Sequence, residues 1–173
     1  MSSACTLDLF RPQDAGPLTR LLHAAYAELG AMGLNYTAVD QDEETTRLRA
    51  QAGRCWIARD AAGSMIGTIT ISLPPSAGLR ELSPLARAPR LAWLNQLAVS
   101  PRWRGRGLAR RLWELGARWA ERAGADSIGL DTAAPARHLV RLYEGWGFTP
   151  RETIHWPGKR YDSLVMLRAL PVR

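Results

Sequence analysis

One segment constrains the fold more than any other, because an apolar run of strand length leads through a glycine-bearing turn into a helix. Residues Leu91 to Val99 are mostly apolar, which is typical of a strand buried on both faces in the middle of a sheet. After the turn at 102–107, apolar side chains recur at helical spacing at Leu108, Leu112, Leu115, Trp119 and Ala120. Gly124 predicts the end of this helix. The segment therefore predicts a strand, turn and helix unit inside an α/β sheet.

The flanking segments predict more strands and helices on both sides of this unit. Strands are expected at 5–10, 54–59, 65–73, 127–131, 153–156 and 163–170, and helices over 18–29, 40–51 and 135–144. Residues 74–89, with four prolines and one glycine, predict a long irregular connection. With 173 residues, of which 46% are hydrophobic, the chain can bury one core, so we expect one mixed α/β domain over 1–173.

Composition argues against membrane insertion, secretion and a disulfide framework. No stretch approaches the roughly 18 consecutive apolar residues of a membrane span, and residues 1–16 lack a basic segment followed by an apolar run. Cys5 and Cys55 are the only cysteines, and they do not have metal-ligand spacing. We therefore expect a cytoplasmic protein, monomeric or homodimeric, that does not bind a membrane.

The positive charge of the chain is concentrated in one quarter of the sequence. The net charge is +7, and the segment 80–122 contains ten arginines against three glutamates, while acidic and basic residues balance elsewhere. A local positive field favours an anion, which could be a small phosphorylated cofactor or a nucleic acid. The alternative is a solvated helix face that binds nothing.

The turn at 102–107 lies in this basic segment and has the features of an anion site. The start of a helix presents unpaired backbone N–H groups at the positive end of the helix dipole. Gly105 and Gly107 allow positive φ angles and a close approach of phosphate, and Arg102, Arg104 and Arg106 add charge. The alternative is an ordinary glycine turn.

Two common nucleotide motifs do not fit this turn. A dinucleotide fingerprint requires a third glycine where Arg110 stands, and a nucleoside-triphosphate loop requires a Gly-Lys-Ser/Thr ending that the chain lacks. Both common nucleotide motifs are thus disfavoured for this turn.

Two stretches resemble the GNAT superfamily of N-acetyltransferases. Residues 97–109, Leu-Ala-Val-Ser-Pro-Arg-Trp-Arg-Gly-Arg-Gly-Leu-Ala, are similar to the cofactor segment with the signature R/Q-x-x-G-x-G/A, and 142–148, Leu-Tyr-Glu-Gly-Trp-Gly-Phe, are similar to L-Y-x-x-x-G-F. Over residues 91–148 the resemblance extends to individual residues. Before about residue 73 only the order of predicted strands and helices matches. It implies a single-domain fold with a splayed, mostly antiparallel sheet of about seven strands and about four helices.

The resemblance also implies an activity and a set of site residues. An acetyl group would pass from acetyl-CoA to a primary amine by direct attack in a ternary complex. The implied cofactor-binding residues are Leu97, Ala98, Val99, Arg102, Trp103, Arg104, Gly105, Arg106, Gly107, Leu108 and Ala109. Tyr143 matches the general acid that protonates the CoA thiolate, which is plausible for a phenol with a pKa of about 10 and a thiol of about 8.5. The alternative for Tyr143 is an aromatic residue packed in the core.

The chain departs from the family pattern at two places. No carboxylate lies at 93–96 on the central strand, where many members carry a glutamate that deprotonates the amine. The base then lies elsewhere or is a relayed water, and the candidate side chains are Asp131, His138, Glu81 and His155, which are titratable but otherwise unsupported. Ala136 stands where an asparagine that contacts the cofactor is frequent. The histidines and the acidic run at 40–44 fit no metal motif, so no metal is expected.

Three functions stay open from the sequence. The first is an acetyltransferase acting on a small-molecule amine or, less favoured, on a protein amine. The second is an acyl-CoA-binding sensor without catalysis, which the missing strand carboxylate suggests. The third and weakest is a basic nucleic-acid-binding module, because Trp113 and Trp119 fall at core positions of a helix instead of on a binding face.

Overall fold

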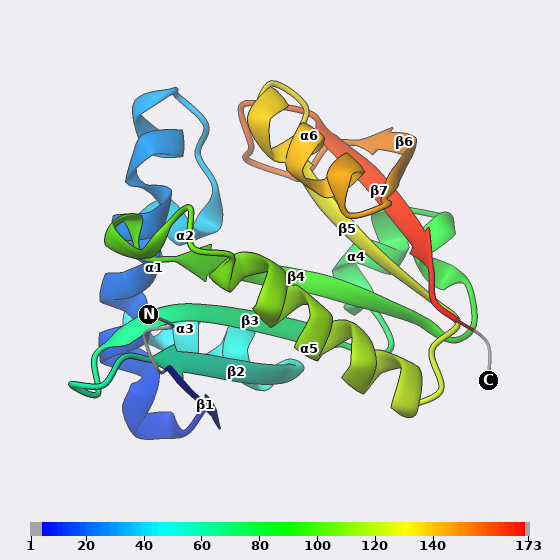
Figure 1. The fold of residues 1–173 in the computed structure, drawn as a ribbon. Helices are drawn as coiled ribbons and strands as arrows, with labels where there is room; N and C mark the ends of the chain where they lie inside the picture. The colour runs from blue at the N-terminus through cyan, green and yellow to red at the C-terminus, as the bar shows by residue number, and fades with distance from the viewer. Residues whose placement is uncertain (1–4, 172–173) are drawn as a thin grey trace.

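The computed structural model describes residues 5–171 and shows one open sheet with helices on both faces (Figure 1). Residues 1–4 and 172–173 lie outside the described residues. The first four belong to the segment 1–16, for which the sequence predicts no secretion signal. The strands are β1 (Thr6–Leu9), β2 (Arg54–Arg59), β3 (Met65–Ser72), β4 (Leu91–Val99), β5 (Ser127–Ala133), β6 (Thr149–Ile154) and β7 (Ser163–Ala169). Their order in the sheet is β1-β2-β3-β4-β5-β7-β6, and only the β4–β5 pair is parallel within the described part of the chain. The predicted mixed α/β class and sheet of about seven strands are confirmed.

Six α-helices are present between residues 5 and 171, two of them short. They are α1 (Ala15–Ala31), α2 (Thr37–Asp40), α3 (Glu43–Gln51), α4 (Ala77–Leu82), α5 (Leu108–Arg122) and α6 (Arg137–Gly145). Helices α5 and α6 cover one face, where Leu112, Trp113 and Tyr143 share a core with Ile69 and Phe148. Helices α1, α3 and α4 cover the other face (Figure 1). The central strand β4 is therefore buried on both faces, as its apolar run predicted.

The structure corrects the expectation for residues 74–89, which do not form an irregular connection throughout. Helix α4 begins after Ser76, whose side-chain oxygen accepts a hydrogen bond from the Leu79 N–H at 3.3 Å. The short 3-10 helix Leu85–Arg87 follows it. The four prolines that predicted a loop lie outside these two helices: two precede α4, one lies between the helices and one follows the second. They therefore interrupt neither helix.

Two further boundaries differ from the predicted ones. The helix expected at 40–51 is divided, because the Asp42 carboxylate caps α3 by accepting from the Thr45 N–H at 2.7 Å. Strand β6 begins at Thr149, earlier than expected, and includes Pro150. An edge strand tolerates this proline because one side of it makes no ladder hydrogen bonds.

Strands β4 and β5 separate after a short region of pairing. Their parallel register covers only Leu91–Trp93 against Ser127–Gly129, whereas β5 pairs with β7 along all of its residues. Beyond this point β4 and β5 diverge and leave a V-shaped opening (Figure 1). Asn95 forms a bulge on β4, because the pairing with β3 shifts between Leu94 and Gln96. Past this point β4 has no neighbouring strand on the side of β5, and its residues Leu97–Val99 line a cavity.

None of the helices described here is long and apolar enough to cross a membrane.

Candidate functional site

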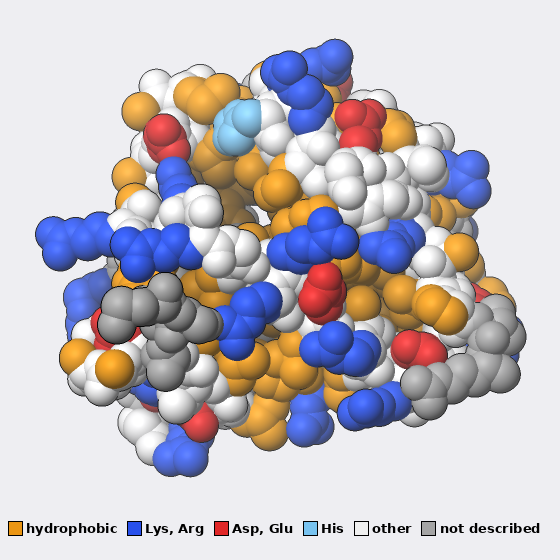
Figure 2. Space-filling model, in the orientation of Figure 1, with side chains coloured by type: hydrophobic (Ala, Val, Ile, Leu, Met, Phe, Trp, Pro, Cys, Tyr) orange, Lys and Arg blue, Asp and Glu red, His pale blue; other side chains and the backbone are white. Residues whose placement is uncertain are grey.

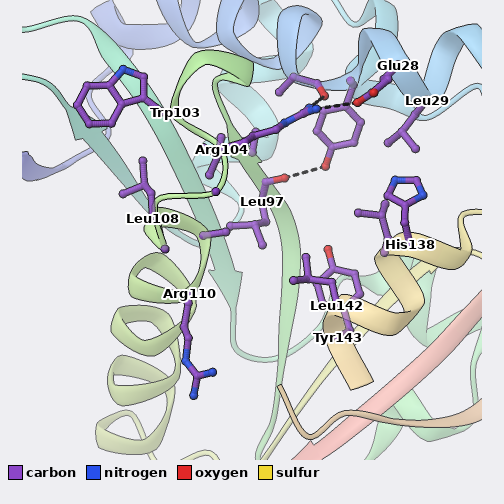
Figure 3. Close-up of a pocket in the computed structure, with 18 of the residues that line it drawn as sticks. Glu28, Leu29, Leu97, Trp103, Arg104, Leu108, Arg110, His138, Leu142 and Tyr143 are labelled. Carbon is purple, nitrogen blue, oxygen red and sulfur yellow. Dashed lines mark hydrogen bonds and ion pairs between the residues drawn. The ribbon is translucent and has the colours of Figure 1, made fainter. Parts of the chain in front are cut away.

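A cavity of about 430 Å³ lies at the opening between the two halves of the sheet. Its walls come from α1, the end of β4, the turn at 102–107, the start of α5 and one side of α6 (Figure 3). Most of the lining is apolar, and Figure 2 shows hydrophobic side chains around a hollow on this face with arginines beside it. The cavity can therefore hold an elongated molecule with an apolar part and an anionic end.

Most of the residues predicted to bind a cofactor meet at this cavity. Those that line it are Leu97, Ala98, Val99, Trp103, Arg104, Gly105, Gly107, Leu108 and Ala109, and Tyr143 lies opposite them. Arg102 and Arg106 are not part of the lining. Arg102 is exposed, and the Arg106 guanidinium lies 4.8 Å from the centre of the Trp103 ring. Either guanidinium could therefore contact the charged end of a ligand only from outside the cavity.

The N-terminus of α5 presents unpaired backbone donors to the cavity. Gly107 is the N-cap residue with φ of 75°, Gly105 has φ of 72°, and neither has a side chain that could cap the helix. The first helical hydrogen bond runs from the Arg111 N–H to the Gly107 carbonyl at 3.1 Å. The N–H groups of Leu108, Ala109 and Arg110 therefore have no partner within the helix, and the helix dipole makes this position favourable for an anion.

Arg104 is engaged within the protein. Its guanidinium forms an ion pair with Glu28 at 2.7 Å and donates to the Ala25 carbonyl at 2.7 Å (Figure 3). These contacts fix the turn against α1. Glu28 also neutralises part of the positive charge that the arginines bring to this turn, so the backbone N–H groups contribute a larger share of its positive potential than the number of arginines suggests.

The edge of β4 faces the cavity at Leu97. The Leu97 carbonyl accepts a hydrogen bond from the Tyr26 hydroxyl at 3.0 Å (Figure 3). The N–H and C=O of a strand residue in an antiparallel pair point to the same side, so the Leu97 N–H also faces the opening. Burial raises the pKa of Tyr26 to about 12, so its hydroxyl remains a donor at neutral pH.

Tyr143 places its ring in the core and its hydroxyl toward the cavity. The side chain is 9% exposed, and its ring packs edge-on against Trp146 at 5.7 Å and Phe148 at 6.1 Å between centroids. Figure 3 shows the hydroxyl directed toward β4. Burial raises the pKa of Tyr143 well above its ordinary value of 10.0, so the hydroxyl stays protonated. The ring of Tyr143 is thus a core residue, and its hydroxyl lies at the cavity wall.

The four tyrosines of the chain predict a cooperative response to alkaline pH. Burial raises the pKa values of Tyr26, Tyr36, Tyr143 and Tyr161. A tyrosine whose pKa is raised on folding stabilises the folded state fully below about pH 10, the ordinary tyrosine pKa. This stabilisation is lost as the pH rises toward the pKa of the folded state. The rise at Tyr26 from 10.0 to about 12 corresponds to about 2 to 3 kcal/mol.

We therefore expect no tyrosinate absorbance near pH 10 in the folded protein, and a steep absorbance rise together with unfolding above pH 11. Spectrophotometric titration alongside circular dichroism checks this. Tyr26→Phe is expected to reduce the loss of stability between pH 10 and 12. A tyrosine that titrates reversibly near pH 10 while the fold persists would show that these side chains are not buried as described.

The candidates for a catalytic base are separated by the structure. His138 is exposed and lines the mouth of the cavity on α6. Asp131 lies on β5 on the other side of the opening and does not line the cavity. Glu81 on α4 is exposed, and His155 forms an exposed ion pair with Asp162 at 2.9 Å, both away from the cavity. No group of three or more metal-ligating side chains occurs among residues 5–171.

Sequence reasoning did not identify the individual residues of α1 that line the cavity. Tyr26, Glu28 and Leu29 line it, as does Leu142 on α6. The helical spacing of α1 predicted a buried face, but a one-dimensional pattern does not show that part of this face meets a cavity. The available signal was a tyrosine and a glutamate at 26 and 28, next to the leucine stripe.

The comparisons with known proteins agree with this geometry. A family model described as "Acetyltransferase (GNAT) family" matches residues 19–148, which is most of the chain. A mycothiol acetyltransferase from Propionibacterium freudenreichii subsp. shermanii is 28% identical over 146 residues, which cover 83% of this chain and 42% of that protein. The chain thus spans less than half the length of this curated relative.

Solved structures share the fold at low sequence identity. The ribosomal-protein-S18-alanine N-acetyltransferase from Escherichia coli has a TM-score of 0.73 and 16% identity over 98% of this chain and 96% of its own. A chain of the NatC complex bound to Gag peptide and CoA has a TM-score of 0.70 and 19% identity, and the match covers 96% of this chain and 99% of that chain. These likenesses show the fold alone. With the family model matched across both the turn and Tyr143, the protein belongs to the GNAT acetyltransferase family.

Proposed function

We propose that the protein transfers an acetyl group from acetyl-CoA to the primary amine of a small-molecule acceptor. The observation that carries this proposal is the uncapped N-terminus of α5, which opens into an elongated apolar cavity opposite the Tyr143 hydroxyl. Membership of the family supports it. A protein amine is the less favoured acceptor.

The N–H groups of Leu108, Ala109 and Arg110 are suited to the pyrophosphate of the donor, and Gly105 and Gly107 allow its close approach. The exposed edge of β4 at 97–99 is suited to pair with the amide groups of the pantetheine arm, as another strand would. Arg102, Arg104 and Arg106 add positive charge around the phosphates, although Arg104 also holds α1.

The reaction follows from the groups at the reacting end of the cavity. The Leu97 N–H polarises the thioester carbonyl, where negative charge develops as the amine attacks. Tyr143 then donates its proton to the departing thiolate, since its raised pKa keeps the hydroxyl protonated until charge develops beside it. The apolar lining limits the access of water, which would otherwise hydrolyse the thioester.

A non-catalytic acyl-CoA sensor is the second candidate. The absence of a carboxylate at 93–96 on β4 favours it. A sensor would bind acetyl-CoA without amine-dependent release of thiol, so binding and turnover measured together separate the two functions. Our proposal further includes a cytoplasmic location, a monomer or homodimer, and no nucleic-acid or membrane partner, in keeping with the two free cysteines at positions 5 and 55.

We expect Gly107→Val to weaken acetyl-CoA binding at least about 10-fold in calorimetric titration. A β-branched residue does not adopt the φ of 75° that directs the turn, so the N–H groups of α5 would lose their alignment. Wild-type binding should also weaken as salt is raised, because the contact is with an anion.

Gly63→Val is the matched control for this variant. Gly63 has a φ of 81° with open space around it, as at Gly107, but it lies in the β2–β3 turn and does not line the cavity. The control should lose similar stability and retain acetyl-CoA affinity. Equal affinity of Gly107→Val and wild type would remove the turn from the proposed binding site.

A further inference from the structure

Glu28 places a negative charge in the wall of a cavity that is suited to an anion. The lining includes Arg104, Arg110 and the start of α5 with its unpaired N–H groups. Among the described residues that line the cavity, Glu28 is the only one with a carboxylate. A fixed negative charge beside an anion site weakens the binding of the anion, because like charges repel. Tight binding of the donor alone therefore does not account for this residue.

Arg104 connects Glu28 with the turn that precedes α5. Figure 3 shows its side chain extending from the turn to Glu28 on α1. Nη1 of Arg104 lies 2.7 Å from Oε2 of Glu28, and Nη2 donates to the Ala25 carbonyl at 2.7 Å. Both the turn and α1 form walls of the cavity. The side chain of Arg104 therefore crosses the space between these two walls.

The two contacts of Arg104 differ in how readily they can be replaced. The Ala25 carbonyl belongs to the backbone of α1 and is fixed by the helix. The Glu28 side chain is 75% exposed and that of Arg104 is 44% exposed, so water can solvate both charges when they separate. An exposed ion pair of this kind contributes less than about 5-fold to an equilibrium constant. The contact with Glu28 is thus the one that a ligand can displace.

A phosphate group is a stronger partner for Arg104 than the exposed carboxylate. A guanidinium has five N–H donors in a planar fork, and the described contacts of Arg104 use only its two terminal nitrogens, once each. A phosphate can accept two parallel hydrogen bonds from this fork. Arg104 can therefore bind a phosphate through part of the guanidinium while it keeps its bond to the Ala25 carbonyl.

The turn leaves space beside Arg104 for such an anion. Gly105 follows Arg104 directly, and both Gly105 and Gly107 line the cavity. A Cβ atom added at either glycine would meet no other atom within 4 Å. An anion bound at the start of α5 thus has room near the arginine, and it competes with Glu28 for the same guanidinium.

We propose that Arg104 exchanges Glu28 for a phosphate of the donor, and that Glu28 thereby lowers the affinity of the site for acetyl-CoA and for the CoA product. This inference rests on the proposed binding of acetyl-CoA in this cavity. In the free protein Glu28 holds Arg104 against α1. A bound donor takes Arg104, while Glu28 remains in the wall and opposes the new negative charge. CoA carries the same phosphates as acetyl-CoA, so the return of Arg104 to Glu28 favours product release.

The opposite role is that the ion pair only fixes the turn in its binding conformation. Loss of the Glu28 carboxylate would then loosen the turn and weaken the binding of acetyl-CoA. The exchange predicts tighter binding instead, because Arg104 becomes free for the phosphates and a repelling charge is removed. The direction of the change in affinity therefore distinguishes the two roles.

The test is calorimetric titration of wild type and Glu28→Gln with acetyl-CoA and with CoA. We expect Glu28→Gln to lower both dissociation constants about 3- to 10-fold. Between Arg104→Gln and the double variant, the same glutamate substitution should change them by less than about 2-fold, since the arginine that is exchanged is absent. Unchanged or weaker binding by Glu28→Gln overturns the inference. A gain that persists in full without Arg104 also overturns it, because Glu28 would then act by direct repulsion.

A donor without phosphates provides a further readout. S-acetylpantetheine has the same thioester and pantetheine arm as acetyl-CoA but no phosphate group. Its affinity, measured by competition with acetyl-CoA, should be equal in wild type and Glu28→Gln when each is referred to its own acetyl-CoA affinity. Tighter binding of S-acetylpantetheine by the variant would mean that Glu28 acts on the shape of the cavity and not through the phosphates.

Glu44→Gln is the matched control for the change in net charge. Glu44 pairs with Arg47 at 2.9 Å on α3, both side chains are partly exposed, and neither residue lines the cavity. This variant should bind acetyl-CoA as wild type does. If wild type itself does not bind acetyl-CoA, the proposed function and this inference are both wrong. If it binds and Glu28→Gln does not bind more tightly, only the exchange is wrong.

Discussion

Tyr143→Phe is expected to lower kcat about 1000-fold with acetyl-CoA and a reactive amine, within the range of a general acid in other enzymes. The substitution removes only the hydroxyl, so the ring keeps its contacts with Trp146 and Phe148 in the core. Without this proton donor the CoA thiolate must leave as an anion in an apolar cavity, which is unfavourable. Steady-state kinetics with a free-thiol readout measures the effect.

The binding of acetyl-CoA distinguishes a catalytic role of Tyr143 from a structural one. Its dissociation constant, measured by calorimetry, should change by less than about 3-fold, because the substitution leaves the proposed pyrophosphate site at α5 untouched. A variant with unchanged kcat would exclude Tyr143 as the acid. A variant that loses affinity and kcat together would show that the hydroxyl maintains the cavity instead.

Gly129→Ala is expected to lower the free energy of unfolding by about 3 kcal/mol, at the upper end of overpacking effects. A Cβ atom there would lie 2.5 Å from Cε3 of Trp93 and 2.8 Å from Cδ2 of Leu167, far inside van der Waals contact. Trp93 is 2% exposed and lies in a packed core, so its ring has little space to move. Urea denaturation measures the change.

Gly145→Ala is the matched control, because it adds the same methyl group to a site with open space around it at the end of α6. We expect its stability to equal or exceed that of wild type by up to about 1 kcal/mol, since alanine restricts the unfolded chain more than glycine. A Gly129→Ala variant as stable as this control would contradict the packing of Trp93 across β5.

The elements encoded by local patterns were predictable. The strand Leu91–Val99, the turn and helix α5 follow from an apolar run, two glycines and a helical stripe, all within 32 residues of one another. Helix α4 was missed because prolines on both sides of it suggested a loop. Its capping residue, Ser76, was the signal that could have revealed it.

The opening in the sheet and its wall on α1 were not predictable in the same way. Strands β4 and β5 stop pairing after Trp93 and Gly129, and no local pattern marks where two strands distant in the chain separate. Likewise, Arg104 was expected to contact an anion, but in the fold it also pairs with Glu28, 76 residues earlier in the chain. Long-range contacts of this kind determine how much charge remains for a ligand.

The most direct test of the proposed function is to incubate the protein with acetyl-CoA and a panel of primary amines. Free CoA thiol and the acetylated amine are then quantified in the same reaction, by thiol titration and mass spectrometry. We predict that at least one amine yields both products in equal amounts, at a rate that falls sharply in Tyr143→Phe. If acetyl-CoA binds in calorimetry but no amine increases thiol release above the hydrolysis rate, the protein is an acyl-CoA sensor and the proposed transfer is wrong.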